Sequence, residues 1–190
     1  MRRVGYTSGM DERRLVKVSK YLAKHLRHQP ERLGLTLQPG GWVRIDKLLE
    51  ACEAAGFDLS RADLESVVAR NDKQRFAIDP TGELIRASQG HSIPVDLGLE
   101  PVAPPAVLYH GTGAGSVEAI LRQGLRPMGR HHVHLSPDTA TARRVGARHG
   151  RPVVLAVDAA AMHAAGEVFY RSDNGVWLVA GVPATFLSVT

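Results

Sequence analysis

The chain reads LYHGTGAGS from Leu108 to Ser116. An apolar run enters this stretch and ends at Tyr109, so residues 107–109 predict a strand, and the three glycines after it predict a turn. Ser116 has the character of an N-cap for a short helix that Gly124 would end. Glycines let the backbone approach a ligand, and a helix start offers N–H groups to an anion. The stretch therefore predicts a strand, a loop and a helix, either as a ligand-binding element or as a tight turn.

The residues after this stretch extend the same domain. Ser136, followed by Pro137, predicts the start of a helix that continues to about residue 149. The Asp-Asn-Gly turn at 173–175 predicts a hairpin. Further strands are expected at 133–135, 153–157, 168–170 and 176–179. The region 107–190 is therefore expected to be an α+β domain that is mostly sheet.

The preceding residues predict a small helical module. Apolar residues recur every three or four positions from Arg13 until Pro30 ends the run, which places Arg27 and His28 at a helix C-terminus. Other expected elements are a helix opened by Asp46 and closed by Gly56, a helix capped by Ser60 and Asp63, an extended pair of 35–37 with 42–43, and a hairpin over 75–87. Helices followed by a hairpin predict a winged-helix-like module over 1–92.

Proline marks the segment between these two regions. Residues 93–106 contain four prolines and almost no periodicity, so we expect the connection between two domains there. The 190-residue length and the 44% hydrophobic content are ordinary for a soluble protein of one or two small domains.

The charge of the chain indicates a polyanionic partner. The formal net charge is +5, which favours nucleic acid without identifying it. Residues 1–32 carry nine Lys/Arg against three Asp/Glu, and all five lysines lie in the first 75 residues. The N-terminal module is therefore expected to contact that partner.

Cysteine content and hydropathy favour a cytoplasmic protein. The single Cys52 excludes an internal disulfide, and its place in a helical pattern predicts a core thiol. No apolar run reaches membrane-spanning length, and the N-terminus has no apolar segment of the signal-peptide type. We expect a cytoplasmic monomer without a membrane partner.

Five short motifs resemble those of the NAD-dependent RNA 2'-phosphotransferases in order and approximate spacing. They are LRHQP at 26–30, NDKQRF at 71–76, QGHS at 89–92, HGT at 110–112 and RHHVHLS at 130–136. The resemblance covers the chain from about Val18 to Trp177. It implies that the winged-helix-like module is joined to an ADP-ribosyltransferase-like mixed β-sheet domain over 107–190, which binds NAD.

The resemblance implies a transferase that acts on RNA in the manner of the tRNA-splicing 2'-phosphotransferases. In that family an internal 2'-phosphate of a spliced RNA displaces nicotinamide from C1'' of NAD, which gives an RNA whose 2'-phosphate is ADP-ribosylated. O2'' then attacks the phosphorus and releases RNA with a free 2'-hydroxyl and ADP-ribose 1'',2''-cyclic phosphate. The expected partners are thus RNA bearing an internal 2'-phosphate and NAD, which is consumed as a co-substrate.

The family's catalytic Arg-His-Arg-Arg tetrad falls, by resemblance, on Arg27, His28, Arg75 and Arg130. Arginine suits phosphate because its planar fork donates paired hydrogen bonds and keeps its proton. His28 would donate a hydrogen bond or act as a general acid toward the departing 2'-oxygen, and the sequence leaves both roles open. Without the resemblance, Arg27 and His28 could complement the helix dipole, and the other two could be solvated surface arginines.

The NAD-binding positions of ADP-ribosyltransferase folds fall, by resemblance, on His110 and His134. Val176 occupies the position where protein-modifying relatives carry a catalytic glutamate. An apolar residue there is reasonable because a phosphate already carries its nucleophilic charge. Further NAD contacts are expected at Gln89, His91, Gly111, Thr112, Ser136 and in the segment 171–175, where Arg171 and Asn174 are the expected contacts. The alternatives are a hydrogen bond near the domain connection for His91 and a helix cap for Ser136.

Three histidines near residue 132 raise the question of a zinc site. Neighbouring residues of a strand point to opposite faces, so of His131, His132 and His134 only the last two can share a face. No cysteine or carboxylate at ligand spacing lies near them. We expect no metal.

Two other functions use parts of the same pattern. A mono-ADP-ribosyltransferase acting on nucleic-acid phosphates or protein would need the NAD domain alone, whereas the retained tetrad favours phosphate transfer. A winged-helix DNA-binding regulator would need base-reading residues on its second module helix, where residues 61–71 offer only Arg61, Arg70 and Asn71.

Overall fold

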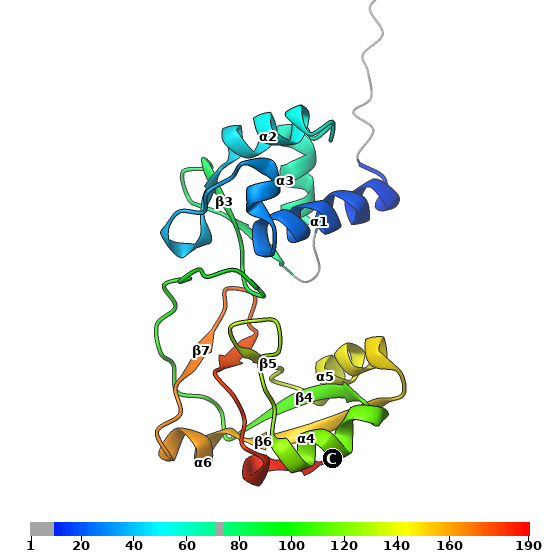
Figure 1. The fold of residues 1–190 in the computed structure, drawn as a ribbon, viewed down its shortest axis with the longest axis vertical. Helices are drawn as coiled ribbons and strands as arrows, with labels where there is room; N and C mark the ends of the chain where they lie inside the picture. Colours follow the sequence, from blue (N-terminus) through cyan, green and yellow to red (C-terminus); the bar gives the residue numbers. More distant parts are fainter. Residues whose placement is uncertain (1–9, 71–73) are drawn as a thin grey trace, which may run out of the picture. The chain divides into compact units, whose positions relative to one another are not determined.

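The structure, a computed structural model, describes residues 10–70 and 74–190. The chain divides into two compact units, Met1–Leu97 (unit 1) and Gly98–Thr190 (unit 2), and the boundary falls inside the predicted connection. Both units combine helices with small antiparallel sheets, so the α+β prediction is confirmed (Figure 1).

Unit 1 contains the helices α1 (Glu12–Arg27), α2 (Ile45–Ala54) and α3 (Arg61–Ala69). Asp11 caps α1, because its Oδ1 accepts a hydrogen bond from Arg14 N at 2.7 Å. The predicted apolar face of α1 is buried, and the placement of Arg27 and His28 at its C-terminus is confirmed. The expected cap of α3 is also present, because Asp63 N donates to Ser60 Oγ at 3.1 Å.

The core of unit 1 lies beneath these helices. Cys52 is fully buried among the apolar side chains of α1, α2 and α3, as predicted. Burial raises the pKa of the Cys52 thiol to about 11, since the thiolate would lose its hydration there. The thiol is therefore protonated and packed as a small apolar group.

The sheet of unit 1 is antiparallel, with the order β1-β3-β2. Its strands are β1 (Val43–Arg44), β2 (Phe76–Ile78) and β3 (Leu84–Ala87). The predicted hairpin over 75–87 is confirmed by the β2–β3 pairing. The predicted pairing of 35–37 with 42–43 is wrong, because β1 pairs with β3 and only Gln38 bridges to Trp42. The 3-10 turns η1 (Pro30–Leu33) and η2 (Pro39–Gly41) take up the intervening chain.

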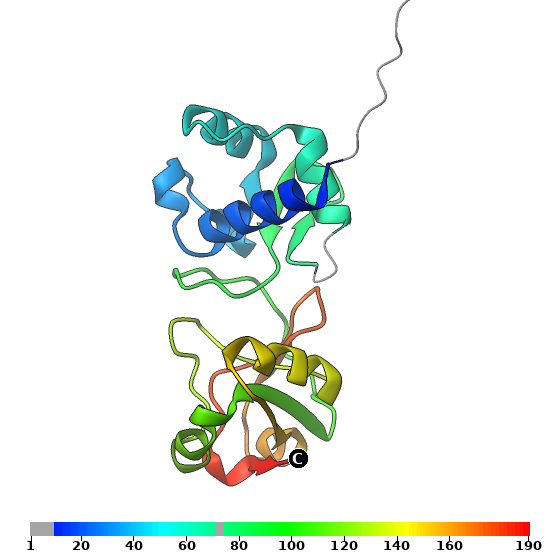
Figure 2. The ribbon, with the colours of Figure 1, turned by 90° about the vertical axis from the view of Figure 1, so that its right-hand side faces the viewer.

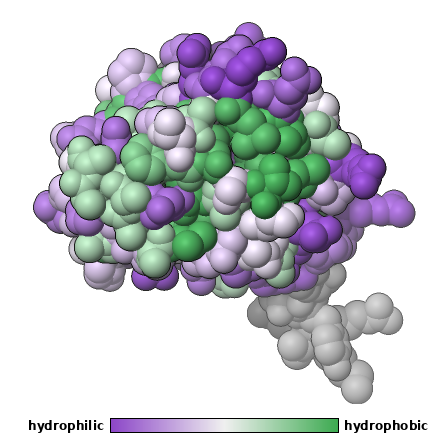
Figure 3. All heavy atoms as spheres, turned by 90° about the horizontal axis from the view of Figure 1, so that it is seen from below, coloured by the Kyte–Doolittle hydropathy of each residue, from purple (hydrophilic) through white to green (hydrophobic). Residues whose placement is uncertain are grey.

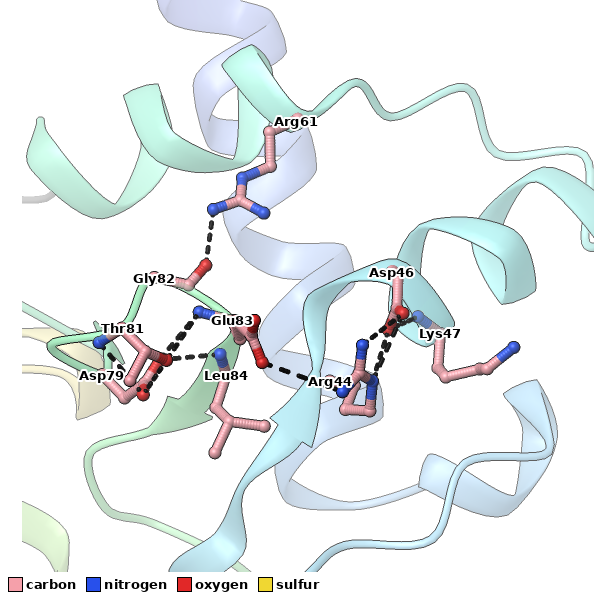
Figure 4. A network of polar contacts seen from close by, with 9 residues as sticks. All are labelled: Arg44, Asp46, Lys47, Arg61, Asp79, Thr81, Gly82, Glu83 and Leu84. Carbon is pink, nitrogen blue, oxygen red and sulfur yellow. Dashed lines mark hydrogen bonds and ion pairs between the residues drawn. The ribbon is translucent and has the colours of Figure 1, made fainter.

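Polar contacts fix the β2–β3 turn, as Figure 4 shows. The Asp79 carboxylate accepts hydrogen bonds from Thr81 Oγ1 and from the backbone N–H groups of Glu83 and Leu84, at 2.5 to 2.9 Å. Arg61 on α3 donates to Gly82 O, while Arg44 of β1 forms an ion pair with Asp46 at 2.7 Å. These contacts tie the hairpin to α3 and the β1 strand to the start of α2.

Unit 2 contains two three-stranded antiparallel sheets, ordered β4-β6-β9 and β5-β8-β7. The strands are β4 (Val107–Gly113), β5 (Val133–Leu135), β6 (Pro152–Asp158), β7 (Phe169–Arg171), β8 (Trp177–Val179) and β9 (Leu187–Val189). The helices are α4 (Val117–Gln123), α5 (Thr139–Gly146) and α6 (Ala159–Ala164). The strands predicted near 133, 153, 168 and 176 are confirmed, and α6 and β9 lie in segments for which no element was predicted.

The glycine-rich segment is a strand and not the predicted loop. All seven residues of β4 pair with β6, from Val107 opposite Asp158 to Gly113 opposite Pro152. A Cβ atom built on Gly111 would lie 1.6 Å from the carbonyl oxygen of Ala142, and one on Gly113 would lie 2.2 Å from that of His149. The glycines therefore let α5 and the turn after it pack directly against the strand (Figure 2).

Of the two helix caps predicted in unit 2, the one at Ser136 is wrong, whereas the positions of Ser116 before α4 and Gly124 after it are confirmed. Ser136 exchanges backbone hydrogen bonds with Tyr109 at 2.7 and 2.9 Å, which keeps it extended beside β4. Asp138 caps α5 instead, since its Oδ1 accepts from Thr141 N at 2.7 Å. Ser116 stands at the N-cap position of α4, but its side chain makes no capping hydrogen bond.

Apolar side chains gather on the face of unit 2 that carries α4, α6 and the C-terminus, which Figure 3 shows in green among polar residues. The more exposed ones in this unit include Val102, Val107, Val168 and Val189. A hollow of about 190 Å³ lies between residues 101–103 and 163–169. Within the part of the chain that the structure describes, no helix is long and apolar enough to cross a bilayer.

Candidate functional site

The first group of candidate residues lies at the C-terminus of α1 in unit 1. Ser92 N donates to the carbonyl of Arg27 at 3.0 Å, and Ser92 Oγ lies 2.9 Å from His28 Nδ1. The 88–92 segment therefore closes the helix end and orients the His28 ring. Ser92 belongs to the QGHS motif but was not predicted as a site residue. Nothing in the QGHS or LRHQP motifs indicates that Ser92 and His28 would be in contact.

Arg75, the residue before β2, lies beside this helix end. Its carbonyl accepts hydrogen bonds from Ser88 N at 2.9 Å and from Arg27 Nη2 at 3.5 Å. The preceding Gln74 has a φ of 41°, a left-handed conformation that is costly for a residue with a side chain. Ser88 Oγ holds the Gln74 carbonyl at 2.8 Å and so supports that conformation. The structure thus places Arg27, His28 and Arg75 on neighbouring segments.

Gln89 and His91 follow β3 in the same unit. His91 is only 3% exposed, and a Cβ atom on Gly41 would lie 3.5 Å from its Nε2. Gln89 is half-buried. This placement favours the structural role for His91 as a packed polar residue of unit 1, and the NAD contacts of both residues stay predictions.

The second group lies in unit 2, where His110, His134 and Arg130 come together. His110 Nδ1 lies 3.3 Å from the carbonyl oxygen of His134. Arg130 Nη1 lies 3.1 Å from His134 Nδ1. The Tyr109–Ser136 bridge holds β4 beside β5 and so brings the histidines of the two strands together. The structure therefore brings together one predicted phosphate ligand and two predicted NAD ligands.

The contacts of the two histidines fix complementary hydrogen-bonding roles. A carbonyl oxygen only accepts, so the proton of His110 lies on Nδ1 and its Nε2 is an acceptor. A guanidinium only donates, so His134 Nδ1 accepts from Arg130 and the His134 proton lies on Nε2. Burial lowers the pKa of His110, and the hydrogen bond to His134 O opposes this shift only in part. His110 is therefore neutral at pH 7.

The lowered pKa of His110 predicts a pH-dependent stability. In the unfolded chain this imidazole takes up a proton near its ordinary pKa of about 6.5, whereas in the folded chain it does so only at lower pH. The unfolded state thus binds more protons, and the free energy of unfolding falls as the pH drops from about 6.5 toward the folded pKa. Denaturant unfolding of wild type and His110→Gln across this range tests this. Identical pH dependence of the two proteins would contradict it.

The β7–β8 hairpin holds the remaining predicted residues. Ser172 is buried and organises the turn, because its Oγ donates to Asn174 Oδ1 at 2.7 Å and accepts from Val176 N at 3.1 Å. Arg171 lies over the Trp177 ring, with its guanidinium carbon 5.8 Å from the ring centroid. Ser172 was predicted only as a member of the 171–175 segment, and its role in holding the turn had no signal in the sequence because serine is common in turns.

The histidines near residue 132 form no metal cluster with other described residues. His132 packs edge-on against Tyr170, with ring centroids 5.6 Å apart. Among residues 10–70 and 74–190, no three His, Cys, Asp or Glu side chains lie close enough to hold one ion. Gly111 and Thr112, which were expected to contact NAD, are buried in β4.

The two groups differ in the chemistry that they can perform. The unit 1 group joins guanidinium and imidazole donors, which suit a multiply charged anion. The unit 2 group presents a neutral acceptor on His110 and a donor on His134, which suit hydroxyl groups of a sugar. Arg130 adds a positive charge at its exposed edge.

Comparison with known proteins decides the family. The family model described as RNA 2'-phosphotransferase, Tpt1 / KptA family matches residues 13–181. The chain belongs to this family. The match spans both units and contains every predicted site residue, so the resemblance of the five motifs is confirmed.

Relatives of the Tpt1 / KptA family in several bacteria match almost end to end. The chain is 63% identical over 178 residues to a protein of Streptomyces coelicolor, which covers 94% of this chain and 97% of that protein. It is 61% identical to a protein of Nostoc punctiforme, with coverage of 94% and 98%, and 52% identical to one of Agrobacterium fabrum, with coverage of 90% and 92%. Each of these relatives is named a probable RNA 2'-phosphotransferase.

Proposed function

We propose that the protein is an NAD-dependent RNA 2'-phosphotransferase that removes an internal 2'-phosphate from RNA. The observation that carries the proposal is the family match over residues 13–181, within which all four residue types of the tetrad are intact. NAD supplies an electrophilic ribose carbon, from which nicotinamide is a good leaving group, and a neighbouring 2''-hydroxyl. A cytoplasmic monomer and a natural role in tRNA splicing stay predictions.

Unit 1 supports a winged-helix-like module by its order of elements. The chain runs α1, β1, α2, α3, β2, β3, and the hairpin formed by the last two strands accepts β1 at its edge. Three helices followed by such a hairpin are typical of modules that hold nucleic acid. We propose that this unit receives the RNA.

Arg27, His28 and Arg75 are proposed to bind the 2'-phosphate. The guanidinium groups neutralise its charge while it attacks C1'', and they stabilise the crowded phosphorus when O2'' attacks in turn. His28, whose ring is oriented by Ser92, donates a hydrogen bond or a proton toward the departing 2'-oxygen of the RNA. Arg130 is proposed as the fourth phosphate ligand on the strength of the family resemblance.

His110 and His134 are proposed to orient NAD. The residues present fit such a ligand, because an accepting Nε2 on His110 and a donating Nε2 on His134 match the hydroxyl groups of a ribose. Val176, whose backbone is held by Ser172, leaves no carboxylate at the position where a general base would stand. A phosphate needs no such base, whereas a protein side chain or a water molecule does.

The proposed chemistry predicts activity without a divalent metal. Arginines take the place that magnesium fills in P-loop enzymes, where the ion neutralises phosphate charge. We expect phosphate transfer to continue at its full rate in excess chelator. Loss of activity in chelator that only added metal restores would contradict this role for the arginines.

The proposal is tested by following the phosphate itself. An RNA with one labelled internal 2'-phosphate is incubated with the protein, with and without NAD, and the RNA is then digested and analysed for that phosphate. We expect the label to leave the RNA only when NAD is present, as ADP-ribose cyclic phosphate. Release of inorganic phosphate without NAD, or retention of the label with NAD, would overturn the proposal.

A further inference from the structure

A row of cations runs along one side of α1 and ends at the candidate site. Arg13, Lys17, Lys20 and Lys24, here called the cationic ridge, recur every three or four residues and are all exposed. With a rise of about 1.5 Å per residue, the ridge extends about 16 Å along the helix, and Arg27 follows one turn beyond it. Figure 2 shows α1 at the front of unit 1, where no other helix lies over it.

The ridge differs from five other cations of unit 1 in having no ion pair with a carboxylate. Arg14, Arg44, Lys47, Arg61 and Arg70 each form an ion pair with an Asp or Glu at 2.6 to 3.2 Å. For the four ridge residues the structure gives no such pair within residues 10–70 and 74–190. The Glu12 carboxylate on the same helix is engaged by Arg70. No carboxylate neutralises the ridge among the described residues, and its one other contact is that of Lys17 Nζ, 5.7 Å from the centroid of the Phe57 ring, so its positive charge is available to a partner.

The spacing of these charges opposes helix stability. Arg13–Lys17, Lys17–Lys20, Lys20–Lys24 and Lys24–Arg27 are like-charge pairs at positions that face each other on a helix. Elsewhere the same spacing carries opposite charges, as in Lys47–Glu50 and Arg61–Glu65. The helix dipole accounts for Lys24 at the C-terminus but disfavours Arg13 in the first turn. An ordinary solvated face would therefore carry mixed signs, and a polyanion is the partner that fits this one.

We infer that the cationic ridge binds the RNA backbone next to the 2'-phosphate and guides the strand to Arg27. This inference rests on the proposed function, from which it takes RNA as the polyanion. Binding is through phosphates, because the ring of Tyr21, the aromatic residue between the lysines, is already engaged by other rings of unit 1. Its ring stacks on Phe57 at 3.6 Å and contacts His25 at 4.3 Å. Recognition by the ridge is thus independent of base sequence.

The test compares two variants of the full chain with equal loss of charge. The ridge variant carries Lys17→Ala, Lys20→Ala and Lys24→Ala, which should fold because alanine favours helix and the like-charge pairs disappear. The control carries Lys47→Ala, Arg122→Ala and Arg126→Ala, three exposed cations that do not belong to the ridge. Affinity for a single-stranded RNA of about 12 nucleotides with one internal 2'-phosphate is measured by electrophoretic shift across a range of salt.

Each lost contact should lower the slope of log affinity against log salt by about 0.7. Because three contacts are lost, we expect the slope of the ridge variant to be smaller by about two. Between about 50 and 200 mM salt, the affinity of the wild type should therefore fall by about twentyfold more than that of the ridge variant. The control should keep the wild-type slope. Equal slopes for ridge variant and wild type, or an equal loss for the control, would overturn the inference. The inference would also be overturned if plain duplex DNA bound to the wild type and lost the same amount of salt slope in the ridge variant.

A second readout separates this inference from the proposed function. The ratio of kcat/KM on the RNA of about 12 nucleotides to that on a 2'-phosphorylated dinucleotide should fall in the ridge variant and stay constant in the control. If this ratio is the same in the ridge variant and the wild type, the inference that the ridge binds RNA is wrong, even if phosphate transfer is observed. If the wild type transfers no phosphate but the ridge variant has a smaller salt slope, the proposed reaction is wrong and the binding surface is supported.

Discussion

Arg75→Ala is expected to accumulate RNA that carries ADP-ribose on its 2'-phosphate. Attack of the phosphate on C1'' is helped by the positive charge of the leaving nicotinamide, whereas the second step must stabilise a five-coordinate phosphorus and expel an RNA alkoxide. Loss of a guanidinium hydrogen bond to phosphate costs about 1.5–3 kcal/mol, or about ten- to a hundredfold in rate if the bond forms chiefly in the transition state. The second step should therefore slow more than the first.

Arg75 suits this experiment because two hydrogen bonds that hold its segment use its backbone carbonyl. Its carbonyl accepts from Ser88 and Arg27, and these hydrogen bonds survive truncation of the side chain. Arg130→Ala is expected to act in the same direction, although it also removes the donor to His134 Nδ1. His110→Ala and His134→Ala are the comparison variants, and they should slow nicotinamide release without such a build-up.

Single-turnover reactions with end-labelled RNA resolve the two steps, because the attached ADP-ribose shifts the RNA on a gel. If the arginine variants are slow yet never show the shifted species, the assignment of the arginines to the second step is wrong.

Gly111→Ala is expected to destabilise unit 2 by about 3 kcal/mol or more. The added Cβ would lie 1.6 Å from the Ala142 carbonyl oxygen and 2.9 Å from Gly146 N, which are backbone atoms of α5. Backbone cannot move aside as a flexible side chain can, so the helix must leave the strand, and such overpacking falls at or above the upper end of the usual range. The midpoint of thermal unfolding should fall by more than about 10 °C for a unit of this size.

Gly115→Ala is the matched control, because a Cβ atom there meets nothing within 4 Å. Its effect should stay within about 0.5 kcal/mol. Calorimetry or denaturant unfolding of both variants shows whether the glycines are needed so that α5 can pack on β4 or so that a ligand can approach the backbone. Two stable variants that differ from wild type only in the KM for NAD would contradict the packing explanation.

The elements that could be predicted from the sequence are those with a local cause. The apolar period of α1, the Ser60 cap of α3 and the Asp-Asn-Gly turn before β8 each act within a few residues. The alanine-rich run after Asp158 also has local signals of a helix, since Asp158 Oδ1 accepts from Ala161 N, and α6 could have been predicted from it.

The remaining features depend on distant segments. A glycine that lets α5 approach a strand looks the same in sequence as one that lets a ligand approach, so the sequence predicts a turn where the second half of β4 lies. Ser136 is drawn into extended backbone by Tyr109, which lies 27 positions away, and the cap passes to Asp138. The contact of Ser92 with His28 joins residues 64 positions apart. No local pattern encodes such pairings.

Release of nicotinamide tests the central claim most directly. The protein is mixed with NAD alone, with NAD and RNA that has a 2'-hydroxyl, and with NAD and the same RNA carrying one internal 2'-phosphate. We expect one nicotinamide for each 2'-phosphate in the third mixture and only background in the other two. Equal release from RNA without the 2'-phosphate, or from NAD alone, would contradict an RNA 2'-phosphotransferase and indicate another use of NAD.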